Sequence, residues 1–195
     1  MKKILLFTMM CLFGLFSLNA QETSFSYDFE DGTLTGWRVY QVSYAYGDNW
    51  KVADAKGKDG SKGIYSASVA PAPGGWGGVE HNPVNYVVTT NAYQITASSS
   101  LSWYVNHESL YSGPTDDHLQ VVISEDGSSF SEAIWTGNGT NTGEFIVQLA
   151  AYEGKNLYFG FYHYKTSWGD GIFSLDNIAL TGGEGGGEEP TPDPE

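Results

Sequence analysis

Residues 157–162 read Leu-Tyr-Phe-Gly-Phe-Tyr, and residues 119–123 read Leu-Gln-Val-Val-Ile. Both runs are short and rich in aromatic and β-branched residues, which are enriched in strands, so we expect them to be central strands. Clusters of Gly, Asn, Asp, Ser and Pro, such as PAPGG at 71–75 and EDGSS at 125–129, separate the runs. Including these two, the expected strands span residues 24–29, 37–44, 63–69, 86–90, 101–107, 118–124, 144–149, 157–164 and 172–180.

This pattern decides the fold class. Many short strands with frequent turns, and no long stretch of helical period, are typical of a β-sandwich or barrel. The chain is therefore expected to be all-β.

The first twenty residues are interpreted as a leader outside the fold. Lys2 and Lys3 precede a mostly apolar run from Ile4 to Leu18, and Ala20 gives a small residue at the expected cut before Gln21. This is the pattern of a secretory signal peptide. The alternative is a lipoprotein leader that keeps Cys11, although the residues before this cysteine do not fit that processing pattern. We expect a secreted or cell-surface protein.

Charge and cysteine content narrow the possible partners. The chain carries 9 basic and 23 acidic residues, a net charge of −14. Such a surface argues against nucleic acid and anionic membranes, and suits cations or neutral partners such as glycans. Removal of the leader would also remove the only cysteine, so the mature chain would lack disulfides and a bound metal is one candidate stabiliser. The sequence contains no second hydrophobic run, so we do not expect the mature protein to insert into a membrane.

After the leader at residues 1–20, the chain divides into a domain at residues 21–181 and a tail at residues 182–195, GGEGGGEEPTPDPE. The tail contains prolines but no other apolar residue, so it is expected to be a flexible acidic linker or tail.

Four segments occur in a characteristic order: YDFEDG at 27–32 followed by Gly36-Trp37, GDNW at 47–50, NYVVTT at 85–90 and LDNI at 175–178. The order resembles the bacterial cleaved-adhesin domains, also called choice-of-anchor J domains, which occur in gingipain-type haemagglutinin regions. LAAYEGK at 149–155 resembles a further segment of that family. Thr90 and Tyr86 depart from the family's usual Pro and Trp. MAM domains are a more distant likeness.

The resemblance implies a jelly-roll β-sandwich of the galactose-binding-like kind, an adhesive role and a structural calcium. Calcium prefers carboxylate and carbonyl oxygens. Asp28 and Glu30 are expected on one face of a strand, and Asp176 lies on the last strand, where an unpaired carboxylate would be costly to bury. The candidate calcium ligands are Asp28, Glu30, Asp48 and Asp176. The alternative is that Asp28, Asp48 and the neighbouring Asp31 are ordinary turn and surface residues.

Three aromatic residues are candidates for ligand binding. Trp76 and Trp168 lie in glycine-containing loops, and Tyr111 lies in a Ser-Leu-Tyr-Ser-Gly loop. Exposed aromatic rings are common platforms in glycan sites. The alternative is that the two tryptophans close the ends of the sandwich. Trp37, Trp50 and Trp103 lie in strand-like contexts and are expected in the core.

We find no pattern that predicts catalysis. His81, His107, His118 and His163 are scattered, without the spacing of a metal site, and no nucleophile elbow or phosphate loop occurs. The sequence therefore predicts a non-catalytic, calcium-stabilised, adhesin-like module that recognises an extracellular glycan or host protein. The alternatives are an accessory carbohydrate-binding module of a larger secreted enzyme and a structural spacer of a surface protein.

Overall fold

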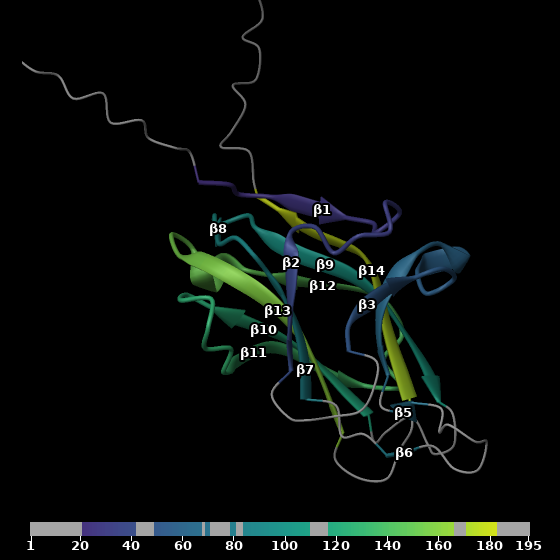
Figure 1. Cartoon of the computed structure of the whole chain (residues 1–195). Helices are drawn as coiled ribbons and strands as arrows, with labels where there is room; N and C mark the ends of the chain where they lie inside the picture. Colours follow the sequence, from purple (N-terminus) through teal and green to yellow (C-terminus); the bar gives the residue numbers. More distant parts are fainter. Residues whose placement is uncertain are drawn as a thin grey trace, which may run out of the picture.

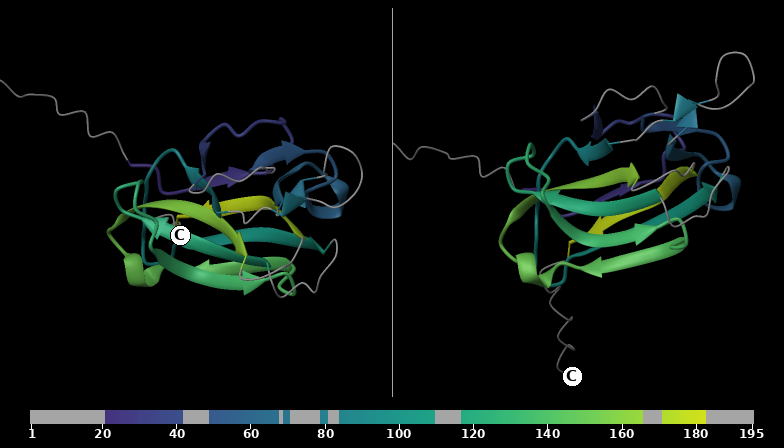
Figure 2. Two further views of the ribbon diagram at one scale, coloured as in Figure 1. Left: turned by 60° about the horizontal axis from the view of Figure 1, so that its bottom comes forward. Right: turned by 90° about the horizontal axis from the view of Figure 1, so that it is seen from below.

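The fold is a sandwich of two antiparallel β-sheets, seen in a computed structural model (Figures 1 and 2). The structure describes residues 21–41, 49–67, 69–70, 79–80, 84–109, 117–165 and 171–182. Within these ranges, helical structure is limited to the 3-10 turns η1 (Lys58–Gly60) and η2 (Ala150–Tyr152). No helix in this part of the chain has the length and hydropathy needed to cross a membrane.

The first sheet has the strand order β12-β9-β14-β4-β3, and β1 also pairs with β14. Because the first and last strands pair, the two ends of the domain lie together at the top of Figure 1. The bounds are β1 (Phe25–Tyr27), β3 (Lys51–Ala53), β4 (Gly63–Ala67), β9 (Ser100–Ser109), β12 (Gly143–Gln148) and β14 (Gly171–Thr181).

The second sheet has the order β11-β10-β13-β7-β2, and β8 also pairs with β13. The expected central strands, β10 and β13, are indeed flanked on both sides. The bounds are β2 (Trp37–Gln41), β7 (Val84–Thr89), β8 (Tyr93–Gln94), β10 (Asp117–Ser124), β11 (Glu132–Asn138) and β13 (Asn156–Lys165). A separate two-stranded sheet pairs β5 (Val69–Ala70) with β6 (Val79–Glu80).

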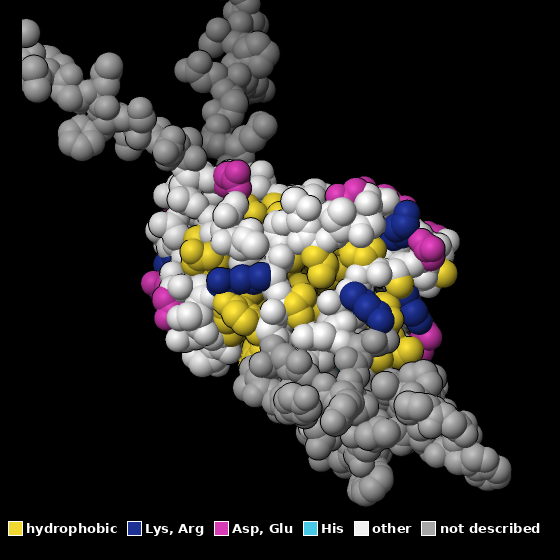
Figure 3. Space-filling model, viewed as in Figure 1, with side chains coloured by type: hydrophobic (Ala, Val, Ile, Leu, Met, Phe, Trp, Pro, Cys, Tyr) yellow, Lys and Arg dark blue, Asp and Glu magenta, His cyan; other side chains and the backbone are white. Residues whose placement is uncertain are grey.

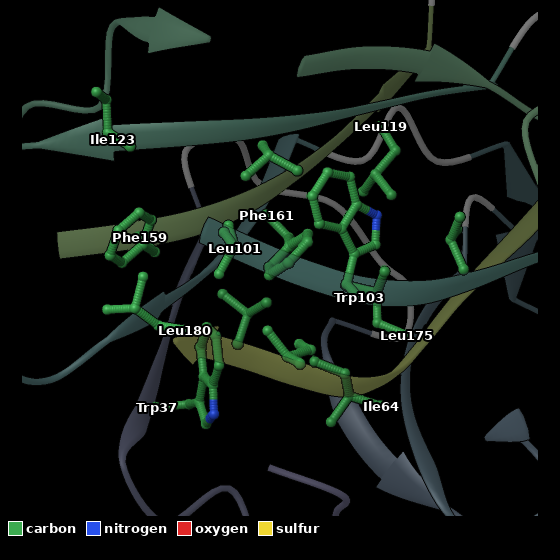
Figure 4. Close-up of a cluster of buried hydrophobic side chains, with 14 of the residues drawn as sticks. Trp37, Ile64, Leu101, Trp103, Leu119, Ile123, Phe159, Phe161, Leu175 and Leu180 are labelled. Atoms are coloured by element: carbon green, nitrogen blue, oxygen red, sulfur yellow. The ribbon is translucent and has the colours of Figure 1, made fainter. Parts of the chain in front are cut away.

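The core fills the space between the two sheets. Side chains alternate along β13, so Leu157, Phe159 and Phe161 are buried whereas Tyr158 and Tyr162 are half-buried on the outer face. Trp37, Trp50 and Trp103 are buried as expected. Figure 4 shows Trp37 and Trp103 among aliphatic and aromatic side chains from both sheets.

Candidate functional site

Two of the expected calcium ligands contact the same loop. The backbone N–H of Lys58 and the hydroxyl of Ser61 donate to Asp176 Oδ2 at 2.9 and 3.0 Å. The backbone N–H of Lys62 donates to Glu30 Oε1 at 2.8 Å. The structure thus brings Glu30 and Asp176, which lie at opposite ends of the sequence, to the loop between β3 and β4.

Glu30 and Asp176 provide carboxylate oxygens, which are ligands that calcium prefers. Asp176 is buried, and its Oδ1 also accepts the backbone N–H of Asn177 at 2.7 Å, so its charge is stabilised by three protein donors. Phe29, Asp59 and Asn177, which adjoin these contacts, have positive φ angles, and such strained residues often cluster at ligand clamps. Within the described ranges, no group of three His, Cys, Asp or Glu side chains is placed to hold a metal. A calcium here would need Glu30, Asp176 and backbone carbonyls.

The other two acidic candidates contribute nothing to this cluster in the described structure. Asp28 is exposed, and its Oδ1 accepts the backbone N–H of Glu30 at 3.2 Å in a local turn. Asp48 lies outside the described residues. The calcium site therefore stays a prediction, centred on Glu30 and Asp176.

Chelation tests this prediction. A ligand that binds only the folded state at a hundredfold excess over its Kd adds about 2.7 kcal/mol to the free energy of unfolding. EDTA should therefore lower the Tm of the wild-type chain and change that of Asp176→Ala much less. Asp31→Ala is the matched control, because Asp31 bonds to the nearby Thr33, and its EDTA response should equal that of wild type. An equal Tm of the wild-type chain with and without EDTA would contradict the predicted calcium site.

The three aromatic loop candidates, Trp76, Tyr111 and Trp168, all lie outside the described residues. Their role in binding remains a prediction. The described part of the chain instead holds a different aromatic group, on the outer face of the second sheet.

This group is a row of stacked rings, which we call the tyrosine row: Tyr86, Tyr162 and Tyr164. The rings of Tyr86 and Tyr162 stack at 4.3 Å with planes 5° apart, and those of Tyr162 and Tyr164 stack at 4.9 Å. His118 stacks on Tyr164 at 4.9 Å and extends the row onto β10. All four side chains are half-buried, so the row is part of the surface.

Strand register places Tyr86 and Tyr162 of the row in a line of side chains that crosses the sheet. Tyr164 lies beside this line, two residues beyond Tyr162 on β13. Tyr40, Tyr86, Tyr162, Gln120 and Thr136 are successive partners on β2, β7, β13, β10 and β11. Since neighbouring strands lie about 4.8 Å apart, this line of side chains is about 19 Å long. The sheet therefore presents an extended line of aromatic and amide side chains.

The loop between β10 and β11 forms a wall beside the row. Phe130, from this loop, lies 6.3 Å from Tyr86. Arg38 and Tyr40 both donate to the carbonyl of Gly127, and the Arg38 guanidinium lies 4.9 Å from the centre of the Tyr40 ring. Asp126 Oδ1 accepts backbone N–H bonds from Ser128 and Ser129. These bonds fix the wall, so the surface is preformed.

The hydroxyls of Tyr86 and Tyr162 stay protonated at ordinary pH. Burial raises the pKa of Tyr86, although a hydrogen bond with Tyr162 opposes the effect. Burial also raises the pKa of Tyr162, and the neighbouring tyrosines add to the increase. Each hydroxyl can therefore both donate and accept a hydrogen bond.

On the face shown in Figure 3, hydrophobic side chains lie over the strands with basic side chains among them, while acidic side chains lie toward the edges. A neutral ligand is thus not excluded by the chain's net negative charge.

Three residues that are scattered along the sequence meet in the interior, which no sequence pattern predicted. Asp117 lies between two histidines, with Oδ2 at 3.1 Å from His107 Nε2 and Oδ1 at 3.5 Å from His163 Nε2. All three side chains are at most 3% exposed. Burial raises the pKa of Asp117, but the two imidazoles outweigh it and hold that pKa below its usual range.

The same network includes a Ser-His-Asp arrangement that is closed to solvent. Ser66 Oγ lies 2.9 Å from His163 Nδ1, and His163 Nε2 faces Asp117. Ser66 and His163 are fully buried, whereas a nucleophile must reach a substrate carbonyl. Asn85 Nδ2 also donates to Ser66 Oγ at 3.3 Å. The arrangement is therefore a structural network between the sheets.

Solved structures with the same fold include adhesin domains. The K1 cleaved adhesin domain of Lys-gingipain from Porphyromonas gingivalis is similar at a TM-score of 0.65 and 22% identity, covering 83% of this chain and 99% of that one. The K3 domain of the same protein matches at 0.58 and 22%, covering 82% and 99%. The fold expected from the sequence resemblance is confirmed.

A carbohydrate-binding module has the same fold. TmCBM61, solved in complex with β-1,4-galactotriose, matches at a TM-score of 0.52 and 13% identity, covering 80% of this chain and 94% of that one. At these identities the likeness concerns the fold. No protein-family model and no curated protein matches the chain.

Proposed function

We propose that this chain, which has the fold of the cleaved adhesin domains, is an exported, non-catalytic module that binds an extracellular glycan along the tyrosine row. The observation that carries the proposal is the stacked row Tyr86–Tyr162–Tyr164 on the outer face of a sheet. Structural neighbours that are adhesin and carbohydrate-binding domains support it.

The chemistry of the row suits a sugar. Because the rings stack on one another, their faces are largely occupied, and the row offers ring edges and hydroxyl groups. A sugar presents hydroxyl groups, which pair with tyrosine hydroxyls that can both donate and accept. Gln120 adds an amide in the same line. The line crosses five strands, which favours a chain of several sugar units over a single one.

The wall also favours a preformed site. Binding loses affinity when loops and side chains must be ordered. Here the rings hold one another, and the Arg38–Gly127 contact fixes the adjacent loop. A ligand therefore meets side chains that are already in place.

Substitution within the row tests the proposal. A glycan array, followed by calorimetric titration with xylohexaose and β-1,4-galactotriose, would measure binding. Tyr162→Ala should weaken binding about 10- to 100-fold, or about 1.4–2.8 kcal/mol, because truncation of a central interface aromatic has effects of this size. Tyr162→Phe keeps the aromatic ring and removes only the hydroxyl. Its affinity therefore shows how much of the loss in Tyr162→Ala comes from the hydroxyl and how much from the stacked ring.

Tyr104→Ala is the matched control, because Tyr104 is a half-buried tyrosine on β9 of the opposite sheet. It should bind as wild type does. Equal losses in Tyr104→Ala and Tyr162→Ala, or array binding that survives Tyr162→Ala, would contradict a glycan site on this face. A signal with host proteins and none with glycans would reassign the partner.

A further inference from the structure

Arg38, the only arginine in the chain, differs from four of the lysines in having no acidic partner in the described structure. Lys56, Lys58, Lys62 and Lys155 each lie within 4.0 Å of a carboxylate. No carboxylate of the described residues is ion-paired with Arg38, although the chain carries 23 acidic residues. Contacts within this part of the chain therefore do not neutralise its positive charge.

The surroundings of Arg38 hold its side chain in place without supplying a negative charge. The guanidinium carbon lies 4.9 Å from the centre of the Tyr40 ring and 5.9 Å from that of the Tyr158 ring, and both distances are within the range of a cation–π interaction. The guanidinium donates to the carbonyl of Gly127, whereas Arg38 Nε is buried and has no hydrogen-bond partner in the described structure. Arg38 as a whole is half-buried, so its side chain is both fixed and accessible to a ligand.

The two acidic residues that precede Gly127 in the wall are engaged elsewhere. Glu125 is bonded to Lys155 at 2.7 Å. Asp126 Oδ1 accepts three local hydrogen bonds. The described part of the wall therefore leaves the guanidinium of Arg38 to pair with a ligand.

Arg38 lies at the β2 end of the line of side chains that crosses the sheet. It is two residues from Tyr40, and Tyr40 is the strand partner of Tyr86 in the tyrosine row. Residues two apart on a strand share one face and are about 6.6 Å apart. A sugar chain that lies along the row would therefore bring a substituent of its unit at β2 to Arg38.

A carboxylate is the substituent that suits this position. A guanidinium forms charge-assisted hydrogen bonds with carboxylates, and these bonds are stronger than those between neutral groups. The pairing is stronger still where both groups are partly removed from water. The chain's net charge of −14 opposes an acidic ligand only at longer range, where salt screens it over about 8 Å.

We propose that Arg38 selects an acidic glycan by pairing with the carboxylate of a uronic acid unit at the β2 end of the tyrosine row. This inference rests on the proposed function for the position of the sugar chain. It adds the chemical class of the ligand, which is an oligosaccharide with a carboxylate on the unit beside Tyr40.

Nuclear magnetic resonance tests the pairing directly, because Arg38 gives the only arginine side-chain Nε–H signal of the chain. At pH 6, where a sugar carboxyl group is ionised, millimolar glucuronic acid should shift this signal. Glucose and the methyl ester of glucuronic acid should leave it unchanged, because neither carries the charge.

Calorimetric titration tests the selection within a sugar chain. Xylohexaose that carries one glucuronic acid branch should bind about tenfold or more tightly than its methyl ester, the size expected for a hydrogen bond to a charged group. Arg38→Gln should bind the acid and the ester equally. Lys155→Gln is the matched control, because Lys155 is paired with Glu125, and it should keep the wild-type preference.

The wild-type chain alone can overturn the inference, even if Arg38→Gln does not fold. An Arg38 signal that glucuronic acid and the branched xylohexaose leave unchanged, or that the methyl ester shifts equally, would contradict it. Equal wild-type affinities for the acid and the ester would also contradict it. If glucuronic acid shifts the Arg38 signal but no oligosaccharide shifts the signals of the tyrosine row, the pairing with Arg38 stands and only the proposed function is contradicted.

Discussion

Trp103→Ala should lower the free energy of unfolding by about 3–5 kcal/mol, the usual range for truncating a buried tryptophan. Trp103 is 1% exposed, and its ring contacts Trp135, Phe145 and Phe161 at 5.3, 5.9 and 6.0 Å. These partners come from both sheets, so the cavity would open between the two layers. Equilibrium unfolding in urea measures the change.

Ile146→Ala provides the contrast for this measurement. Ile146 lies on the adjacent strand β12 and is 63% exposed, so its truncation should change stability by no more than about 0.5 kcal/mol. Similar losses in the two variants, or a loss below about 1 kcal/mol for Trp103→Ala, would mean that this tryptophan is not at the centre of the core.

Asp117→Ala should also cost about 2–6 kcal/mol at pH 7, because it leaves two buried imidazole N–H groups without their acceptor, and each unsatisfied buried polar group costs about 1–3 kcal/mol. The carboxylate is 3% exposed and faces His107 and His163. Its folded-state pKa lies below the unfolded value, so its contribution is present above about pH 4 and is lost as the pH falls further. Urea unfolding of both proteins at pH 7 and pH 3 measures this.

Asp126→Ala is the control for that series, since Asp126 accepts local hydrogen bonds but is exposed. Its substitution should cost clearly less at pH 7. A wild-type advantage over Asp117→Ala that stays constant down to pH 3 would show that the carboxylate's charge does not contribute.

Local sequence patterns predicted most of the fold because strands and turns have short-range signatures. Nine expected runs correspond to strands, although the run 63–69 is divided between β4 and β5. Strands β3, β6, β8 and β11 were missed. The first three of these are only three, two and two residues long, and β11 contains Gly137 and has a register shift against β10.

The sites were harder to predict because they depend on register. Glu30 and Asp176 were expected near each other, and the described contacts bring both to the β3–β4 loop. The tyrosine row was not expected. Alternation along β13 places Tyr162 and Tyr164 opposite the buried Phe161, but only strand pairing places Tyr86 beside Tyr162. His107 from the first sheet and Asp117 and His163 from the second meet where the two sheets pack together, not through sequence spacing.

A chemical-shift titration of the isotope-labelled chain with the strongest glycan-array ligand tests the central claim most directly. We expect the largest changes at Tyr86, Tyr162, Tyr164 and Gln120, on the outer face of the second sheet. Changes confined to the indole signals of Trp76 and Trp168, to the Tyr111 ring, or to the opposite sheet would contradict a glycan site on the tyrosine row.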